Sequence, residues 1–298
     1  MSFDDCTTRM SKPNGVVLVD KPAGWTSHDV VAKLRGILKE RRIGHAGTLD
    51  PMATGLLVIA VGPCTRLLQF ATATTKTYTG TLRLGSATDS LDADGNVTAT
   101  MAVPALSDTH VNDVAATLTG PQMQIPPMVS AIKVDGKKLY ELAREGTEIE
   151  RAPRPVVISS FTLTRANETD WNFVTEVSAG TYVRVLASDL AVALGTLGHL
   201  VALRRVASGQ AHVDRAWTLD QVAEKGVSVL ASPLSLVDHL PMRSVSDDEI
   251  VALRQGKRIA AETGEYDTAV ATHDGEVVAM LTRKDHLWQP SVVLPPNS

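Results

Sequence analysis

The chain is poor in cysteine and contains no long apolar segment. Its 298 residues include two cysteines, Cys6 and Cys64, which lack the short spacings of a zinc site. Two cysteines cannot form the disulfide framework of a small secreted domain, so we expect a reducing compartment. The first 14 residues lack the apolar centre of a signal peptide, and no apolar run approaches the roughly 20 residues of a membrane-spanning helix. We therefore expect a soluble, cytoplasmic protein.

The chain also lacks an excess of positive charge, with a formal net charge of −4. Residues 232–298 contain ten acidic and six basic side chains, so the first 231 residues balance at 23 of each sign. Basic clusters on one face could line a nucleic-acid backbone, although charge runs more often cover solvated faces. The local clusters are Lys33, Arg35, Lys39, Arg41 and Arg42; Lys133, Lys137 and Lys138; and Arg204 with Arg205.

The apolar pattern predicts an α/β (α+β) fold. Residues 15–19 form a continuous apolar run typical of a buried strand, and Ser27 is expected to cap a helix with one apolar face. Alternating patterns near residues 78–84 and 171–177 predict strands with one buried face. Residues 181–187 are expected to form a strand that runs into a helix near residue 188. Because regular βαβ alternation is missing, we predict a mixed, mainly antiparallel central sheet flanked by helices.

The last part of the chain predicts a separate, smaller module. Ser246 precedes three acidic residues, which is typical of a helix N-terminus, and the helix is expected to end at Gly256. Asp274-Gly275 between two apolar runs predicts a β-hairpin. We therefore expect a flexible tail over 1–13, a main domain over 14–231 and a small β-rich domain over 232–298.

The most specific motif is residues 44–57, GHAGTLDPMATGLL. Its glycines allow tight turns, Pro51 restricts the backbone after Asp50, and the apolar run that follows anchors the loop. A carboxylate held on such a loop can act as a nucleophile, a general base or a metal ligand. An Asp-Pro turn beside a core strand is by itself an ordinary structural feature.

The full string resembles the catalytic-aspartate motif of the TruB family of tRNA pseudouridine synthases. Further blocks resemble that family in order across most of residues 14–231: NGVVLVDKPAGWTS (14–27), KTYTG (76–80), PPMVSAIKVDGKKLYELAREG (126–146), GTYVR (180–184) and LRR (203–205). The resemblance implies the pseudouridine synthase fold with a C-terminal PUA-like RNA-binding domain. It also implies an isomerase that converts uridine-55 in the T loop of tRNA to pseudouridine, without a cofactor or a metal.

The resemblance assigns a role to each pocket residue. Asp50 is the reacting carboxylate, Arg184 is its countercharge, and Tyr78 stacks on the uracil. Leu203 closes the pocket, and His45 fills the space that the flipped nucleotide leaves in the T loop.

A second set of residues is expected to hold the RNA outside the pocket. The block 126–146 resembles an insertion, here called the thumb and expected over about 124–154, that grips the T arm. The block 14–27 resembles the opening motif of the family, for which a structural role is favoured. The cations expected to contact RNA are Lys21, Lys133, Lys137, Lys138, Arg144 and Arg205.

The chemistry is compatible with one carboxylate and no metal. Pseudouridine formation breaks the N1–C1′ bond, rotates the uracil and rejoins it through C5. Asp50 could add to C6 of uracil, attack C1′, or take the C2′ proton in a glycal route, and the sequence does not choose between these. A carboxylate in a dry pocket would have a raised pKa, so a neighbouring cation is needed to keep it ionised.

The loop 88–95, TDSLDADG, has two interpretations. Its spaced aspartates resemble a calcium loop, but a frame that starts at Ser90 puts Met101 where the bidentate glutamate belongs. The TruB resemblance instead implies that Asp89 faces the arginine and completes an Asp50–Arg184–Asp89 network. A solvated turn rich in aspartate is the alternative.

Two other functions stay open beside the isomerase acting on free tRNA. One is a non-catalytic protein that binds or folds RNA, for which loss of Asp50, Tyr78 or Arg184 would be the mark. The other is a guide-RNA-dependent synthase of the same superfamily. The thumb-like block and the small terminal domain favour the stand-alone enzyme, whose expected partner is the T stem-loop of tRNA and which is expected to be a monomer.

Overall fold

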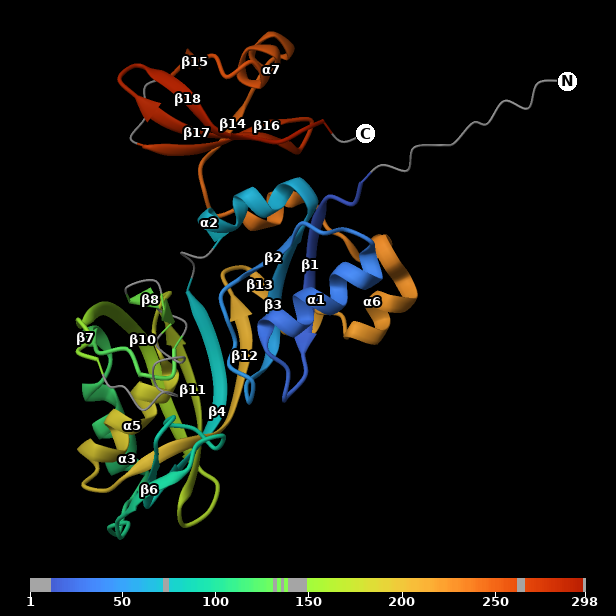
Figure 1. Ribbon diagram of the computed structural model, residues 1–298. Helices are drawn as coiled ribbons and strands as arrows, with labels where there is room; N and C mark the ends of the chain where they lie inside the picture. Colours follow the sequence, from blue (N-terminus) through green and yellow to red (C-terminus); the bar gives the residue numbers. More distant parts are fainter. Residues whose placement is uncertain are drawn as a thin grey trace, which may run out of the picture.

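The computed structural model describes residues 12–71, 75–130, 149–261 and 266–296, with the backbone alone of 133–134 and 137–138. They form a larger unit on a nine-stranded sheet and a smaller C-terminal unit on a five-stranded sheet (Figure 1). Two further strand pairs lie apart from these sheets: β5 (Ser86–Thr88) with β6 (Val97–Thr100), and β8 (Lys133–Val134) with β9 (Lys137–Lys138).

The larger sheet is mixed and mainly antiparallel, which confirms the predicted fold class. Its main path runs through β1 (Gly15–Lys21), β3 (Thr54–Val61), β12 (Gly198–Ser208), β4 (Lys76–Leu84), β11 (Asp170–Val177), β10 (Arg154–Arg165) and β7 (Gly120–Gln124). Two more strands pair outside this path, β2 (Ile43–Ala46) with β3 and β13 (Ala211–His212) with β12. β3 and β12 pair in parallel, and the other neighbours are antiparallel. The antiparallel pattern is therefore interrupted by one parallel pairing, between β3 and β12.

Helices cover the two halves of this sheet and enclose separate cores. Apolar residues of α1 (Ser27–Leu38) and α6 (Leu219–Lys225) pack with β1 and β3, and those of α3 (Asp108–Thr117) and α5 (Val183–Ala193) pack with β4, β10, β11 and β12 (Figure 1). The short helices are α2 (Leu68–Ala71) and the 3₁₀ turns η1 (Gly62–Leu67), η2 (Val213–Arg215), η3 (Gly226–Val229) and η4 (Pro233–Leu236). None of the helices in the described part of the chain is both long and apolar enough to cross a membrane.

The described residues of the smaller unit form a five-stranded sheet and a helix. Its strands run in the order β14 (Met242–Ser244), β16 (Thr268–His273), β17 (Glu276–Lys284), β18 (Leu287–Val293) and β15 (Ile259–Ala260), and the helix is α7 (Asp247–Arg254). Ser246 caps α7 as predicted, since its hydroxyl accepts a hydrogen bond from the Glu249 N–H. The predicted hairpin between β16 and β17 is also confirmed. Its turn residues Asp274 and Gly275 have φ angles of 48° and 78°, as a tight hairpin turn requires.

An apolar contact joins the two units. Leu56 and Leu67 from the larger unit belong to one buried cluster with Met280 and Val292 from the smaller one. Beside this cluster, an Arg66 guanidinium nitrogen donates to the Val293 carbonyl at 2.7 Å. The small sheet is therefore held against the main domain rather than only tethered to it.

Two local predictions were wrong. The N-cap of α1 is Thr26, which forms a capping box with Asp29, and Ser27 is the first helical residue. The strand expected over 181–187 is instead the beginning of α5, because Val183, Leu186 and Ala187 turn into the core at helical spacing. Arg184 consequently lies on the first turn of a helix and not on a strand.

Candidate active site

Asp50 lies in the turn between β2 and β3. The two strands pair with each other antiparallel, and the Ala53 N–H closes the turn by donating to the Asp50 carbonyl at 3.1 Å. Gly55 follows with a φ of 96°, and a Cβ there would lie 2.3 Å from the Arg205 carbonyl of β12. Glycine therefore lets the strand after Asp50 approach β12 at the point where these parallel strands meet.

Two buried side chains fix the backbone on either side of Asp50. The Ser27 hydroxyl accepts from the Leu49 N–H at 2.9 Å and donates to the Leu49 carbonyl at 3.2 Å. The Lys21 ammonium donates to the carbonyls of Pro22 at 2.9 Å, Trp25 at 2.6 Å and Pro51 at 3.2 Å. The block 14–27 therefore supports the Asp50 turn from below, as its predicted structural role implies.

Lys21 is consequently not the RNA contact that the sequence suggested. The side chain is 0% exposed, and its three ammonium donors match three backbone carbonyls. Burial lowers its pKa from 10.5 to about 8, although the nearby Asp50 carboxylate acts in the opposite direction. A buried cation of this kind stabilises a backbone arrangement and cannot reach a phosphate.

Arg184 and Asp50 form the predicted ion pair. The Arg184 Nε lies 2.9 Å from Asp50 Oδ2, and its two terminal nitrogens donate to the carbonyls of Ser90 at 2.6 Å and Val129 at 2.8 Å. The Arg184 side chain is 2% exposed, whereas that of Asp50 is 36% exposed. The guanidinium is therefore fixed from several sides, and the carboxylate it holds stays accessible.

Opposing effects set the protonation of Asp50. Burial is the largest and raises the pKa of the carboxyl above its usual value. Arg184 lowers it by its charge and its hydrogen bond, and Lys21 lowers it further, while the Asp92 carboxylate raises it. The net direction is upward, so Asp50 retains some of the basicity that a general base or nucleophile needs.

The second carboxylate at Arg184 is Asp92 and not the predicted Asp89. Asp92 Oδ2 lies 3.5 Å from Arg184 Nε, and the side chain is buried. Asp89 instead accepts hydrogen bonds from the backbone and side-chain amides of Asn96. The positive φ of Leu91, 63°, turns the chain within this loop, so the aspartate after it reaches the arginine.

Apolar residues form a wall beside the ion pair. Tyr78 and Leu203 are both buried and belong to one cluster with Leu49 and Ala53 of the Asp50 turn. Leu203 lies opposite Gly80 on β4, two residues from Tyr78 along the strand. Tyr78 and Leu203 therefore lie in the same apolar cluster as two residues of the Asp50 turn.

His45 lies on β2 at the edge of the same region. Its ring contacts the exposed His28 edge to face, with centroids 5.7 Å apart and planes at 81°. Burial lowers the pKa of His45, and the charges of His28 and Arg205 act in the same direction. The favoured neutral ring fits a packing or stacking group better than a proton donor.

Arg205 also corrects a prediction, because it is not an RNA contact. Its side chain is fully buried, and its guanidinium donates to the carbonyls of Leu56 at 2.7 Å and Gly47 at 3.1 Å. The arginine therefore ties β12 to the Asp50 turn. The side chains of Lys133, Lys137, Lys138 and Arg144 lie outside the described residues, although the backbone at the three lysines forms the β8–β9 hairpin.

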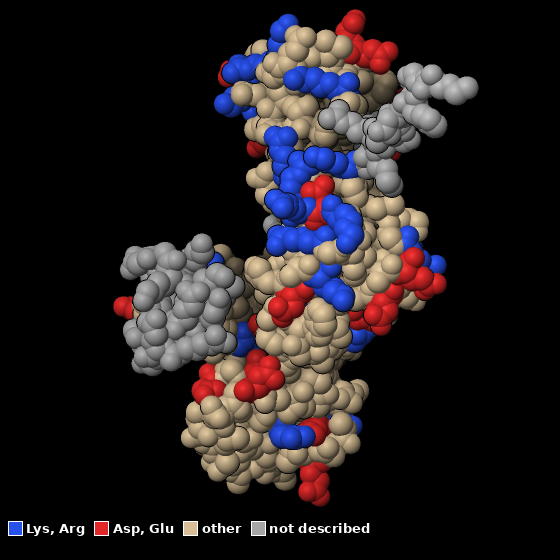
Figure 2. Space-filling model, turned by 45° about the vertical axis from the view of Figure 1, so that its right-hand side comes forward, with Lys and Arg blue, Asp and Glu red and all other residues tan. Residues whose placement is uncertain are grey.

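Exposed cations gather on the face between the two units. Figure 2 shows Lys and Arg side chains concentrated there, above a lower part of the main domain with fewer of them. Lys39, Arg41 and Arg42, in the turn after α1, are exposed cations of the main domain. The expected basic cluster is therefore on the surface, in contrast to Lys21 and Arg205.

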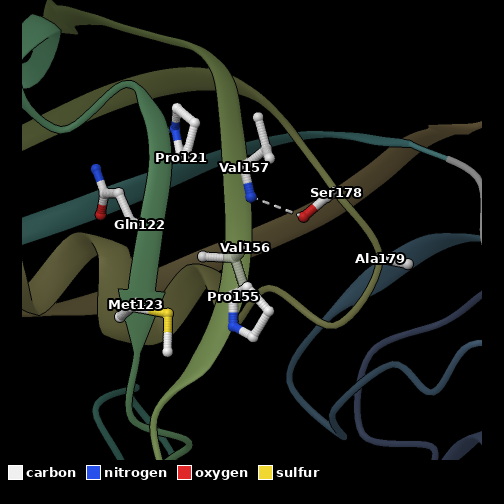
Figure 3. A pocket seen from close by; sticks show the side chains of 8 residues that line it. All are labelled: Pro121, Gln122, Met123, Pro155, Val156, Val157, Ser178 and Ala179. Atoms are coloured by element: carbon white, nitrogen blue, oxygen red, sulfur yellow. Dashed lines mark hydrogen bonds between the residues drawn. The ribbon is translucent and has the colours of Figure 1, made fainter.

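A groove of about 590 Å³ lies elsewhere, on the outer side of β7 and β10 (Figure 3). Pro121, Met123, Pro155 and Val157 line it, and Ser178 accepts a hydrogen bond from the Val157 N–H at its side. No residue of the Asp50–Arg184 pair or its apolar wall lines this groove. It is therefore separate from the candidate active site.

Two protein-family models match most of the chain. Residues 35–183 match the N-terminal domain of the TruB family pseudouridylate synthases, and residues 184–233 match the tRNA pseudouridylate synthase B C-terminal domain. The tRNA pseudouridine synthase B of Paenarthrobacter aurescens is 43% identical over 96% of this chain and 96% of its own. That of Nocardia farcinica is 44% identical over 98% of this chain and 96% of its own.

Solved structures show the same fold. A Cbf5-Nop10-Gar1 complex contains a chain with a TM-score of 0.75 and 24% identity, covering 97% of this chain and 87% of that one. An H/ACA RNP bound to a substrate RNA gives a TM-score of 0.74 at 22% identity, covering 95% of this chain and 86% of that one. The matched family models and the named relatives define a pseudouridine synthase, which is an isomerase. The chain belongs to the TruB family of pseudouridylate synthases.

Proposed function

We propose that this enzyme converts uridine-55 in the T loop of tRNA to pseudouridine, with Asp50 as the essential carboxylate. The Asp50–Arg184 ion pair carries the proposal, because it places one accessible carboxylate beside a buried cation at an apolar wall. Relatives with more than 40% identity over most of their length are named tRNA pseudouridine synthase B, which supports tRNA as the substrate.

The proposed reaction rearranges the uridine without adding or removing atoms overall. The N1–C1′ bond breaks, the uracil rotates, and a C5–C1′ bond forms. The proton originally on C5 leaves, and N1 gains a proton. Asp50 takes part through C6, C1′ or the C2′ proton, and Arg184 favours its ionised form in each case.

We propose that the target nucleotide is flipped out of the T loop, because a base inside a folded loop cannot reach a pocket on a protein surface. Flipping costs roughly a few kcal/mol in lost stacking. The buried ring of Tyr78 and the side chain of Leu203 offer an apolar surface for the flipped uracil. His45 is proposed to stack where the nucleotide was, which offsets part of the cost.

Tritium release from tRNA transcripts that contain [5-³H]uridine tests this proposal. We expect wild-type protein alone to release one tritium per tRNA, and to release none when the target uridine is changed to cytidine. Asp50→Asn should abolish release while tRNA affinity changes little, because phosphate contacts dominate affinity. A residual rate within about tenfold of wild type, or ~1.4 kcal/mol, would contradict the essential role of Asp50.

The same assay separates the alternatives. A non-catalytic RNA-binding protein would bind tRNA without releasing tritium, but Asp50, Tyr78 and Arg184 are all present, which disfavours it. A guide-RNA-dependent synthase would be inactive on free tRNA until guide RNA and partner proteins were added. Full activity of the isolated chain would exclude both.

A further inference from the structure

The N-terminus of α5 has no side-chain cap of its own. Tyr182 occupies the cap position, and its side chain makes no capping hydrogen bond. The buried Gln124, at the end of β7, supplies the contact instead. Its Oε1 accepts from the Tyr182 N–H at 2.7 Å, and its Nε2 donates to the Tyr182 carbonyl at 3.1 Å. A glutamine 58 positions away in sequence therefore fixes the N-cap residue of this helix.

The segment that carries Gln124 also contacts the guanidinium two residues after that cap. Arg184 donates to the Val129 carbonyl at 2.8 Å, and Val129 follows Gln124 by five residues. The residues between them include Pro126, whose carbonyl accepts from the Arg151 guanidinium at 3.1 Å. Residues 124–129 thus contact the beginning of α5 twice, at the Tyr182 backbone through Gln124 and at the Arg184 side chain through Val129.

We propose that Gln124 is a positioning residue that sets the place of Arg184 and, through it, the ionisation of Asp50. Arg184 reaches Asp50 Oδ2 through Nε at 2.9 Å, a geometry that a small displacement of the first turn of α5 would break. This inference rests on the proposed catalytic roles of Asp50 and Arg184. Both hydrogen bonds of Gln124 go to the Tyr182 backbone, so its effect on Arg184 passes through the beginning of α5.

The position of Gln124 also links the RNA-gripping insertion to the reaction. β7 leads into the expected thumb, and β10 receives the chain on its return. A displacement of residues 124–129, where the chain enters the thumb, would move the Val129 carbonyl and the Gln124 amide together. We therefore infer that residues 124–129 and the beginning of α5, including Arg184, form one hydrogen-bonded unit.

Gln124→Met tests the proposal, because methionine keeps the length and apolar stem of glutamine but makes neither hydrogen bond. Gln122→Met is the matched control. Gln122 lies two residues earlier on β7 and faces the same way, but its amide donates to the Leu118 carbonyl at the end of α3, away from Arg184. The three readouts are the single-turnover rate of tritium release, the Kd for tRNA and the dependence of the rate on pH.

We expect Gln124→Met to lower the single-turnover rate by about tenfold to a hundredfold, as misplaced catalytic groups do, with a Kd within about twofold of wild type. The acid limb of its pH–rate profile should move to higher pH, because a displaced Arg184 supports the Asp50 carboxylate less well. Gln122→Met should match wild type in all three measurements.

Other outcomes would overturn the inference. A purely structural role predicts a lower melting temperature and a smaller active fraction, with an unmoved pH profile for the active molecules. Equal effects of Gln124→Met and Gln122→Met would likewise remove any special role of Gln124. If Gln124→Met does not fold, Gln124→Asn, which keeps the amide on a shorter stem, gives the same pH test. Inactive wild-type protein would contradict the proposed function itself, which is a separate result.

Discussion

Arg184→Met should destabilise the protein as well as stop the reaction. Arg184 is buried and forms ion pairs with two carboxylates, Asp50 at 2.9 Å and Asp92 at 3.5 Å. Methionine fills much of the same volume but leaves both carboxylates without their shared cation. Asp50 is 36% exposed and can be hydrated, whereas Asp92 is buried and cannot. The stability cost therefore falls mainly on Asp92.

The magnitude follows from the burial of the pair. Removing one partner of a buried ion pair typically costs about 3–5 kcal/mol. Asp92 retains hydrogen bonds from the Ser90 hydroxyl and the Asp94 N–H, which favours the lower end of that range. The lost hydrogen bonds to the Ser90 and Val129 carbonyls add roughly 1 kcal/mol each. We expect a total loss of about 5 kcal/mol in the free energy of unfolding.

A double-mutant cycle tests the cause of this loss. Urea unfolding would be measured for Arg184→Met, Asp92→Asn and the double variant, beside their single-turnover tritium release. Neutralising Asp92 should restore about 2 kcal/mol to the Arg184→Met protein, a coupling within the range seen for contacting groups. Activity should not return, because Asp50 still lacks its cation. Additive losses within about 0.5 kcal/mol would refute the reasoning, since they would show that Asp92 does not depend on Arg184.

Three further predictions concern pH, the Asp50 turn and the thumb. Burial raises the pKa of Asp50, so on acidification the single-turnover rate should begin to fall at a higher pH than it would with an aspartate of ordinary pKa. An acid limb at the position of an ordinary aspartate would contradict this. Ser27→Ala should lower the free energy of unfolding by about 1–3 kcal/mol and slow tritium release, because the buried N–H and carbonyl of Leu49, next to Asp50, lose their partner. An unchanged urea midpoint would contradict this prediction. Replacing the thumb lysines Lys133, Lys137 and Lys138 together should weaken tRNA binding. The slope of log Kd against log salt concentration should flatten by about 0.7–0.9 per lost phosphate contact, and the single-turnover rate at saturating enzyme should be largely kept. A rate as low as that of Asp50→Asn with intact binding would place the segment in the catalytic centre.

The sequence predicted those parts of the site that depend on local signals. Glycines and Pro51 around Asp50 predicted a tight turn ahead of an apolar run, and the structure contains that turn before β3. The alternation around Tyr78 likewise predicted its strand and its burial. The helix at Arg184 could not be predicted in the same way, because the group that caps it is Gln124, far away in sequence. β-Branched residues just before and after Tyr182 therefore suggested a strand.

The sequence also contained a signal that would have separated buried from exposed cations. Lys21 continues the alternation of Val17 and Val19 along β1, so it faces the same core. Arg205 follows Leu203 by two positions on β12 and is buried in the same way. Strand periodicity thus indicates which cations cannot reach RNA, whereas residue type alone does not. The choice between Asp89 and Asp92 depended on a left-handed backbone conformation at Leu91 that no local residue preference indicates.

Lys21 fixes the backbone of the Asp50 turn at a cost in the stability of the fold. Its pKa is about 8 in the folded protein against 10.5 for a free side chain, so the unfolded chain binds more protons between these values. Stability from this group therefore rises with pH through that window and is lowest below it, where the buried ammonium is charged. Only the charged form has three donors for the carbonyls of Pro22, Trp25 and Pro51; the neutral amine has two. The charged ammonium thus holds the Asp50 turn most completely but stabilises the fold least. This trade of stability for a fixed turn is expected of a residue that serves the site and not the core.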